Sequence, residues 1–189
     1  MTHLIAFTGL KGSGKDTAAA GLLRGGSNFR KIAFAEPLKA MLSTLLQSRG
    51  CSVYDVSRYL EGDLKEEPTD FLMGRTPRHA MQTLGTEWGR GLIDSALWVD
   101  TFQRRVRETW SKGLSVVVTD VRFPNEVEAV HALGGVVYCV LRPGTVETGH
   151  PSEALVKSLN VDGELDNIYT TPGGFEYFIR DYFERQLEG

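Results

Sequence analysis

The most informative stretch of this 189-residue chain is Gly9-Leu10-Lys11-Gly12-Ser13-Gly14-Lys15-Asp16-Thr17. It matches the pattern G-x-x-x-x-G-K and lies between an apolar run at residues 4–8 and an alanine- and leucine-rich run at residues 18–23. These flanks predict a strand before the loop and a helix after it, which is the context that the pattern requires. We therefore expect a phosphate-binding loop rather than a glycine-rich turn with a solvated lysine.

The loop supplies the groups that the phosphates of a nucleotide need. Glycines allow the backbone to wrap closely around phosphate oxygens, and successive amides and the helix N-terminus donate hydrogen bonds to them. The ammonium group of Lys15 can reach the β and γ phosphates of ATP. The residues expected to bind the nucleotide are Lys11, Gly12, Ser13, Gly14, Lys15, Asp16 and Thr17.

The loop departs from the usual pattern at the position after the lysine. A Ser or Thr hydroxyl that holds magnesium usually stands there, but this chain has Asp16 and places the hydroxyl one residue later, at Thr17. Both residues are candidate ligands of Mg²⁺. A threonine after one intervening residue is similar to nucleoside monophosphate kinases, and Gly-Lys-Asp resembles phosphomevalonate kinases and phage deoxynucleotide kinases. The variant favours a small-molecule kinase over a GTPase or a motor ATPase.

Further apolar runs predict a sheet. Continuous β-branched runs suit parallel strands covered on both faces. The expected strands after the first are residues 29–34, 114–119, 136–141 and a weaker run at 168–170. Helical patterns separate them at residues 38–47, 77–90, 97–110, 125–133, 152–159 and 175–187. This alternation predicts an α/β fold with a parallel sheet of about five strands, helices on both faces, and ligands at the carboxyl ends of the strands.

The length fits a single P-loop kinase domain, residues 1–189, that carries an insertion. The core is expected to comprise residues 1–35 and 114–189. The stretch 36–113 is longer than a crossover between parallel strands needs, so we expect a helical insertion that binds the acceptor. A loop at residues 142–152 resembles a short lid, in which Arg142 would close over the transferring phosphoryl group. Within this loop, His150 is interpreted as a solvated histidine rather than a catalytic base.

A second polar motif, Asp120-Val-Arg-Phe-Pro-Asn-Glu126, follows the third expected strand. Because the chain leaves the sheet near the phosphate-binding loop here, a carboxylate at this point takes the place of a Walker-B-like acid. Asp120 is a candidate for holding magnesium through water or for accepting a hydrogen bond from substrate, and Arg122 for binding a phosphate with two parallel hydrogen bonds. A helix cap at Asp120 and a solvated ion pair at Arg122 remain open.

The insertion contains a polar stripe with gaps. Glycine in a helix costs about 1 kcal/mol relative to alanine, so two glycines beside arginine and glutamine suggest close approach of a ligand. A loosely helical surface segment is the alternative. On a helix, the residues of the stripe are Arg78, Gln82, Gly85, Thr86 and Gly89. The candidate acceptor contacts in this segment are Arg75, Arg78, Gln82, Gly85 and Thr86.

Two other residues of the insertion have two interpretations each. Trp98 can stack on a base, but it also begins an apolar series with Phe102 and Val106 that suits core packing. Lys39 follows the second expected strand and can approach a phosphate, but it can equally be a surface lysine.

Composition limits the partners and the compartment. A net charge of −3 provides no strong basic footprint, so we expect no nucleic-acid polymer as a partner. Cys51 and Cys139 have neither C-x-x-C nor metal spacing and are expected to be free thiols of a reducing cytosol. The N-terminal residues lack the pattern of a signal peptide, and no apolar run approaches the length of a membrane span. These features predict a cytoplasmic protein without a membrane partner.

Four motifs together resemble the bacteriophage deoxynucleoside monophosphate kinase family: residues 12–17, 34–39, 84–90 and 119–126. The resemblance spans most of the chain. It implies a P-loop nucleoside monophosphate kinase-like fold, ATP and Mg²⁺ as cofactors, and phosphorylation of several deoxynucleoside monophosphates (dNMPs) to diphosphates, in the host cytoplasm if the chain is phage-encoded. The implied partners are the small molecules dNMP and ATP, and a homodimer is left open.

Carried over position by position, the resemblance places the ATP phosphates on residues 12–17. It implies deoxynucleotide contacts from Lys39, Arg78, Gly85, Thr86, Trp98, Asp120, Arg122 and Glu126. The residues expected to act on the transferring phosphoryl group are Lys15, Arg78, Asp120, Arg122 and Arg142.

Two alternatives to this function stay open. One is another small-molecule kinase, similar to phosphomevalonate kinases; the tryptophans and Gln82 favour a base-reading pocket instead. The other is a non-catalytic regulatory module that binds ATP as a switch. Lys15, Asp120 and the candidate clamp arginines argue against such a module.

Overall fold

The computed structural model of the chain describes residues 1–25, 28–145, 155–156 and 158–187. Contacts between residues divide the chain into two compact units. The first unit comprises residues 1–33 and 101–189, and the second comprises residues 34–100.

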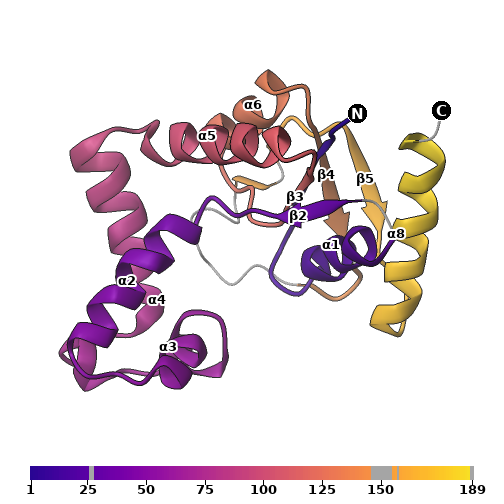
Figure 1. Cartoon of the computed structure of the whole chain (residues 1–189). Coiled ribbons are helices and arrows are strands. Elements are labelled where there is room, and N and C mark those ends of the chain that lie inside the picture. The colour runs from indigo at the N-terminus through magenta and orange to yellow at the C-terminus, as the bar shows by residue number, and fades with distance from the viewer. Residues whose placement is uncertain (26–27, 146–154, 157, 188–189) are drawn as a thin grey trace. The chain divides into compact units, whose positions relative to one another are not determined.

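The first unit is built on a five-stranded sheet in the order β2-β3-β1-β4-β5 (Figure 1). Every pairing is parallel, and the central strand β1 places Ala6 between Val118 of β3 and Val137 of β4. The carboxyl ends of all strands therefore meet at one edge, where the loop after β1 and the segment after β3 both begin. The strands are β1 (Leu4–Thr8), β2 (Phe29–Lys31), β3 (Ser115–Val118), β4 (Val136–Leu141) and β5 (Gly163–Asp166).

One face of the sheet is covered by α1 (Lys15–Arg24) and α8 (Pro172–Leu187) (Figure 1). Alternate strand residues pack there against the two helices, and the largest fully buried side chains of this core are Phe7, Phe175 and Phe183. A glycine in α1, Gly21, allows the helices to approach closely, because a Cβ there would lie 2.6 Å from the carbonyl oxygen of Glu176.

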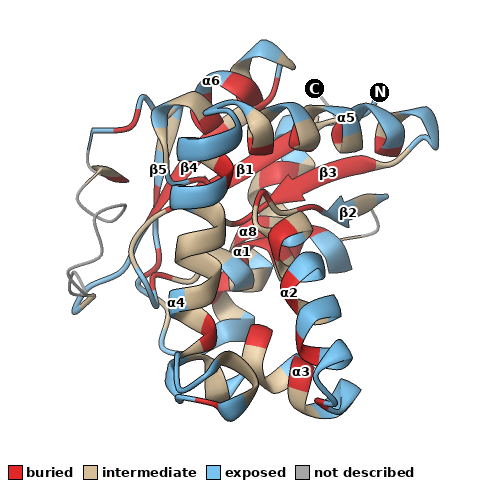
Figure 2. Ribbon diagram, turned by 90° about the vertical axis from the view of Figure 1, so that its left-hand side faces the viewer, coloured by how far each residue is buried: buried red, intermediate tan, exposed pale blue. Residues whose placement is uncertain are grey.

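The opposite face of the sheet is covered by α5 (Leu97–Ser111) and α6 (Pro124–Ala132), as Figures 1 and 2 both show. With helices on both faces, every residue of β1 and β3 is buried (Figure 2). From α5, Arg105 donates to the Ala33 carbonyl oxygen and Trp110 to that of His3, both at 3.5 Å. Residues 101–113 consequently group with the core, and the second unit ends earlier than the insertion expected at 36–113.

The second unit is helical and has its own buried cluster, formed mainly by α2 and α3 around Leu42, Leu46 and Cys51. The helix α3 had not been predicted; Ser52 begins it by accepting a hydrogen bond from the amide of Asp55. The elements are α2 (Glu36–Ser48), α3 (Val53–Leu60), the 3₁₀ turns η1 (Asp63–Glu66) and η2 (Asp70–Leu72), α4 (Pro77–Gln82) and the π-helix η3 (Thr83–Ile93).

The single α-helix expected over residues 77–90 is two elements, since α4 passes directly into the π-helix η3. The wider turns of a π-helix change which residues share a face, so the polar stripe drawn with α-helical spacing does not continue beyond Gln82. Glycines weaken the α-helix locally, and the carbonyl oxygen of Gly85 in η3 accepts a hydrogen bond from Nε1 of Trp98 at 2.8 Å.

The fifth strand was predicted in the wrong place. It comprises Gly163–Asp166, whereas residues 168–170 lie outside any strand and the side chain of Ile168 is exposed. As an edge strand, β5 buries only Leu165, so it has no continuous apolar run to mark it.

Half of the predicted helix 152–159 lies outside the described residues; of the other half, residues 155 and 156 are helical and residues 158 and 159 are not. Cys51 and Cys139 are free and buried, and burial raises the pKa of both thiols. Among the described residues, no helix is long and apolar enough to cross a membrane.

Candidate active site

The loop between β1 and α1 takes a backbone path that requires glycine. Gly9 and Gly14 have φ angles of 138° and 106°, a region that other residues rarely adopt. Space is also limiting at Gly9, because a Cβ there would lie 2.5 Å from the Val140 carbonyl oxygen of β4. Gly14 stands at the N-cap position of α1, so the loop leads directly into the N-terminus of this helix, where amides are available to an anion.

The side chain of Lys15 folds back over the loop. Its Nζ donates hydrogen bonds to the carbonyl oxygens of Gly9 at 2.8 Å and Leu10 at 2.7 Å. The ammonium group is thereby held at the loop, where it provides a positive charge.

A pocket at the carboxyl edge of the sheet joins the phosphate-binding loop to the segment after β3. It brings together four residues predicted from separate parts of the sequence, Lys11 and Lys15 from the loop and Asp120 and Arg122 from the segment. Three cations and one carboxylate around one pocket suit a polyphosphate and its metal ion. The complete lining is Gly9, Lys11, Lys15, Asp120, Val121, Arg122 and Val156.

Two buried side chains hold the segment after β3. The Thr8 hydroxyl, at the end of β1, donates to the Val121 carbonyl oxygen at 2.9 Å. The carboxylate of Glu126, 3% exposed, accepts from the backbone amides of Arg122 at 2.7 Å and Phe123 at 3.2 Å. Glu126 was expected to contact the deoxynucleotide; the structure gives it a capping role at the start of α6, through which it fixes the backbone of Arg122.

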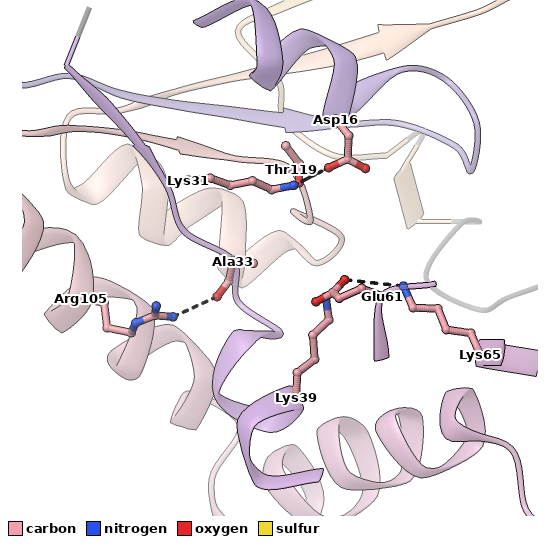
Figure 3. A network of polar contacts seen from close by, with 8 residues as sticks. All are labelled: Asp16, Lys31, Ala33, Lys39, Glu61, Lys65, Arg105 and Thr119. Carbon is pink, nitrogen blue, oxygen red and sulfur yellow. Dashed lines mark hydrogen bonds and ion pairs between the residues drawn. The ribbon is translucent and has the colours of Figure 1, made fainter. Parts of the chain in front are cut away.

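Asp16 is engaged by neighbours in the first unit (Figure 3). Its carboxylate lies 2.5 Å from Nζ of Lys31, and Oγ1 of Thr119 donates to it at 3.1 Å. Partial desolvation opposes ionisation, but the hydrogen bond and charge of Lys31, aided by Thr119 and Lys15, keep the pKa of Asp16 below its ordinary value. Asp16, one of the two predicted magnesium ligands on α1, is thus already paired with a cation.

No group of three or more His, Cys, Asp or Glu that could hold a metal is found in the described parts of the chain. Magnesium needs few protein ligands when it is held by phosphates and water, and its donors are oxygens. The hydroxyl of Thr17 and the carboxylate of Asp120 are donors of that kind, and Asp120 lines the pocket beside Lys15.

In the second unit, two of the predicted acceptor cations, Lys39 and Arg78, are paired with glutamates. Nζ of Lys39 lies 2.8 and 2.9 Å from the two carboxylate oxygens of Glu61, which Lys65 also approaches at 3.8 Å (Figure 3). Arg78 forms an ion pair with Glu66 of η1 through Nε. Lys39 is thus more than an isolated surface lysine, and each cation is held by a carboxylate group.

Trp98 packs in the core of the second unit. Its side chain is 4% exposed and tilts against Trp88, with 6.2 Å between ring centroids. A Cβ at Gly89 would lie 2.5 Å from the Trp98 ring, and one at Gly85 would lie 3.3 Å from Leu38. The structure therefore supports the packing interpretation of Trp98, and these two glycines make room for side chains of the unit, where a ligand had been expected.

The other predicted acceptor contacts in this unit lie at its surface. Gln82 ends α4 half-buried, and Thr86 is exposed on η3. Arg75 is exposed and closes a tight turn in which its amide donates to the Leu72 carbonyl oxygen at 3.0 Å.

Comparison with known proteins identifies the family. A family model described as deoxynucleotide monophosphate kinase matches residues 73–167, half of the chain. A protein of Acanthamoeba polyphaga mimivirus that carries the name of a deoxynucleotide monophosphate kinase is 34% identical over 167 residues, covering 82% of this chain and 83% of its own. This chain belongs to the deoxynucleotide monophosphate kinase family.

Two further similarities have lower sequence identity. The deoxynucleoside-5'-monophosphate kinase of Escherichia phage T5 is 26% identical over 121 residues, which cover 60% of this chain and 48% of the phage protein. The matched part thus spans about half of the T5 enzyme. The crystal structure of TT1252 from Thermus thermophilus covers 99% of this chain and 97% of its own with a TM-score of 0.50 and 18% identity, which shows a shared fold.

Part of the lid predicted for this deoxynucleotide monophosphate kinase cannot be placed. Residues 146–152 of the expected lid, including His150, lie outside the described residues. Arg142 is described and exposed. Its carbonyl oxygen accepts two hydrogen bonds from Thr145, one from the backbone amide at 3.3 Å and one from the side-chain hydroxyl at 2.8 Å. It therefore begins a turn at the end of β4.

Three polar residues near the kinase's phosphate-binding loop were not predicted from the sequence. Thr8 and Lys31 act through the contacts described above, and Asn167 follows β5 and donates from Nδ2 to the Ser13 carbonyl oxygen at 2.9 Å. The rule that parallel strands end at one edge would have indicated Asn167 if the fifth strand had been placed correctly.

Proposed function

We propose that this chain transfers the γ-phosphate of ATP to a deoxynucleoside monophosphate, producing the diphosphate and ADP. The observation that carries the proposal is the pocket in which Lys11, Lys15, Asp120 and Arg122 meet, in a member of the deoxynucleotide monophosphate kinase family. Its polarity suits the donor phosphates and the phosphoryl group in transfer.

The donor site is assigned to the loop of residues 11–17. The amides before and within the first turn of α1 would bind the β and γ phosphates, and Lys15 would neutralise charge that develops on the oxygens in transfer. Because Lys15 is already held by the carbonyl oxygens of Gly9 and Leu10, little reorganisation is needed when ATP arrives.

Magnesium is assigned to Thr17 and Asp120, the latter directly or through water. The ion would supply charge neutralisation across the β and γ phosphates. Asp16 is assigned a supporting role, since its carboxylate is engaged by Lys31 and Thr119.

The acceptor is assigned to the second unit, with Lys39 and Arg78 as the cations that bind its phosphate. Lys39 is paired with the carboxylate of Glu61, and Arg78 with that of Glu66. A phosphate oxygen can accept the same charged hydrogen bonds that these carboxylates accept. The attacking atom is an acceptor phosphate oxygen that already carries negative charge. No proton has to be removed from it, so these residues orient and neutralise, and no general base is required.

A substrate panel tests the proposal. ATP and Mg²⁺ are supplied with each of the deoxy and ribo monophosphates and with phosphomevalonate, and ADP formation is followed by a coupled assay. We expect steady turnover with one or more dNMPs and none with phosphomevalonate. Turnover with phosphomevalonate alone would support a different small-molecule kinase, and no turnover with any acceptor would support a regulatory module.

A further inference from the structure

Asn167 connects three elements at the base of the phosphate-binding loop. It directly follows β5 and is 5% exposed. Its backbone amide donates to the carbonyl oxygen of Leu141, the last residue of β4, at 2.7 Å. Its side-chain Nδ2 donates to the carbonyl oxygen of Ser13, within the loop, at 2.9 Å. The residue is thus anchored to the sheet through its backbone and to the loop through its amide group.

The contact lies at the point where the loop turns into α1. Ser13 is 1% exposed, so its carbonyl oxygen would lose a protected partner if the amide were removed. The next residue, Gly14, has a φ of 106°, and a Cβ on it would lie 2.4 Å from Nδ2 of Asn167. Glycine at position 14 and asparagine at position 167 therefore fit one another, because the first leaves the space that the second occupies.

We propose that Asn167 is a positioning residue that holds the peptide between Ser13 and Gly14 in the conformation that binds the donor phosphates. The inference rests on the proposed function in that ATP is taken to bind at this loop. Asn167 acts through the loop backbone, and it has no assigned contact with the reacting atoms.

The expected consequence is a change in the population of the competent loop. Without the hydrogen bond, the unliganded loop can rotate this peptide and leave the phosphate-binding arrangement. The apparent dissociation constant for ATP then rises in inverse proportion to the fraction of molecules that keep the competent conformation. Loss of a buried hydrogen bond corresponds to about a tenfold change in such an equilibrium.

The test compares two variants that each lose one hydrogen bond between a buried side chain and the backbone. Asn167→Leu removes the donor to Ser13 with little change in volume. Ser115→Ala is the matched control, because Ser115 is 6% exposed, accepts from the amide of His3 at 3.0 Å, and lies at the start of β3, away from the carboxyl edge of the sheet. Three quantities are measured for both variants: stability in urea, hydrogen exchange of the amides of residues 12–16 without nucleotide, and ATP affinity by calorimetry.

We expect both variants to lose stability, but only Asn167→Leu to show faster exchange in residues 12–16 and ATP binding that is weaker by up to about tenfold. Unchanged exchange together with an ATP affinity within about twofold of the wild type would overturn the inference and leave Asn167 a purely structural role. None of these readouts uses a monophosphate, so a failed kinase panel and a failed positioning role are separate results.

A second variant keeps the test informative if Asn167→Leu does not fold. In Asn167→Asp a protonated carboxyl group can donate to the Ser13 carbonyl oxygen, whereas the carboxylate cannot. The ATP affinity of this variant relative to the wild type should therefore improve as the pH falls from about 8 to about 5.5, because burial raises the pKa of a carboxyl group. A relative affinity that does not change with pH would contradict the proposal.

Discussion

At the scale of single residues, three charged groups of this kinase have polar partners within the protein. Lys15 is held by two loop carbonyl oxygens, Asp16 by Lys31 and Thr119, and Arg78 by Glu66. Such pairs place side chains before substrate binds, and exposed pairs of this kind contribute little to stability. Their importance should therefore be visible in substrate constants and pH dependence.

Asp16 should make the free energy of unfolding depend on pH in the acid range. Its folded-state pKa is lowered from 3.8, chiefly by Lys31 against the opposing effect of desolvation, so its contribution is fully present above about pH 4 and is lost as the pH falls through the folded-state value. In Asp16→Asn this contribution is absent. Urea unfolding in a pH series should show a stability difference between the wild type and Asp16→Asn that is constant near neutrality and shrinks in acid. A difference that grows in acid would show that the carboxylate is not stabilised by Lys31.

Arg78 should bind the acceptor through its forked geometry as well as its charge. Lysine keeps the charge but cannot form two parallel hydrogen bonds to a phosphate. Arg78→Lys should therefore lower kcat/KM for the monophosphate by the equivalent of about 1.5 to 3 kcal/mol and leave KM for ATP nearly unchanged, and Arg78→Ala should be at least as severe.

The matched control for Arg78 is Arg58→Lys, because Arg58 is another arginine of the second unit paired with a carboxylate, that of Asp63 at 2.7 Å. It has no assigned contact with substrate, so both substrate constants should stay close to the wild-type values. Equal losses for ATP and monophosphate in Arg78→Lys, or the same loss in Arg58→Lys, would remove Arg78 from the acceptor site.

At the scale of elements, the sequence predicted what local physics controls. Continuous apolar runs identified β1 and β4 with correct boundaries, since central parallel strands are buried on both faces. The edge strand β5 and the π-helix η3 were not predictable in this way: one buries a single residue, and the other depends on the packing of Trp98 against glycines. Asn167 was missed for the same reason, because its position depends on β5.

The packing of η3 can be tested at two of its glycines. A Cβ at Gly89 would lie 2.5 Å from the Trp98 ring. A Cβ at Gly91 would have the Thr86 carbonyl oxygen as its nearest neighbour, at 3.5 Å. Gly89→Ala should lower the free energy of unfolding by about 1 to 3 kcal/mol, the usual range for overpacking. Gly91→Ala is the control and should have little effect in the same urea titration followed by tryptophan fluorescence. Equal behaviour of the two variants would mean that η3 does not pack on Trp98 as described.

At the scale of the whole molecule, the chain combines a unit built on a parallel sheet with a helical unit. Four residues from two distant segments of the sequence, Lys11 and Lys15 from one and Asp120 and Arg122 from the other, were expected at one site, and the structure brings them to one pocket. The rule that parallel strands end at a common edge is sufficient for that prediction. The proposed acceptor residues stay a prediction that rests on the resemblance, because α-helical spacing does not describe a π-helix and does not predict the pairs with Glu61 and Glu66.

The central claim, that the loop at residues 11–17 directs the γ-phosphate of ATP to a deoxynucleoside monophosphate, is tested most directly by following labelled phosphate. ATP labelled in the γ position is mixed with a dNMP, Mg²⁺ and either the wild type or Lys15→Met, and the labelled products are separated. The wild type should produce labelled dNDP, and Lys15→Met, folded as judged by circular dichroism, should produce it at least about a hundredfold more slowly. Near-normal formation of dNDP by Lys15→Met, or release of the label as inorganic phosphate alone by the wild type, would contradict the claim.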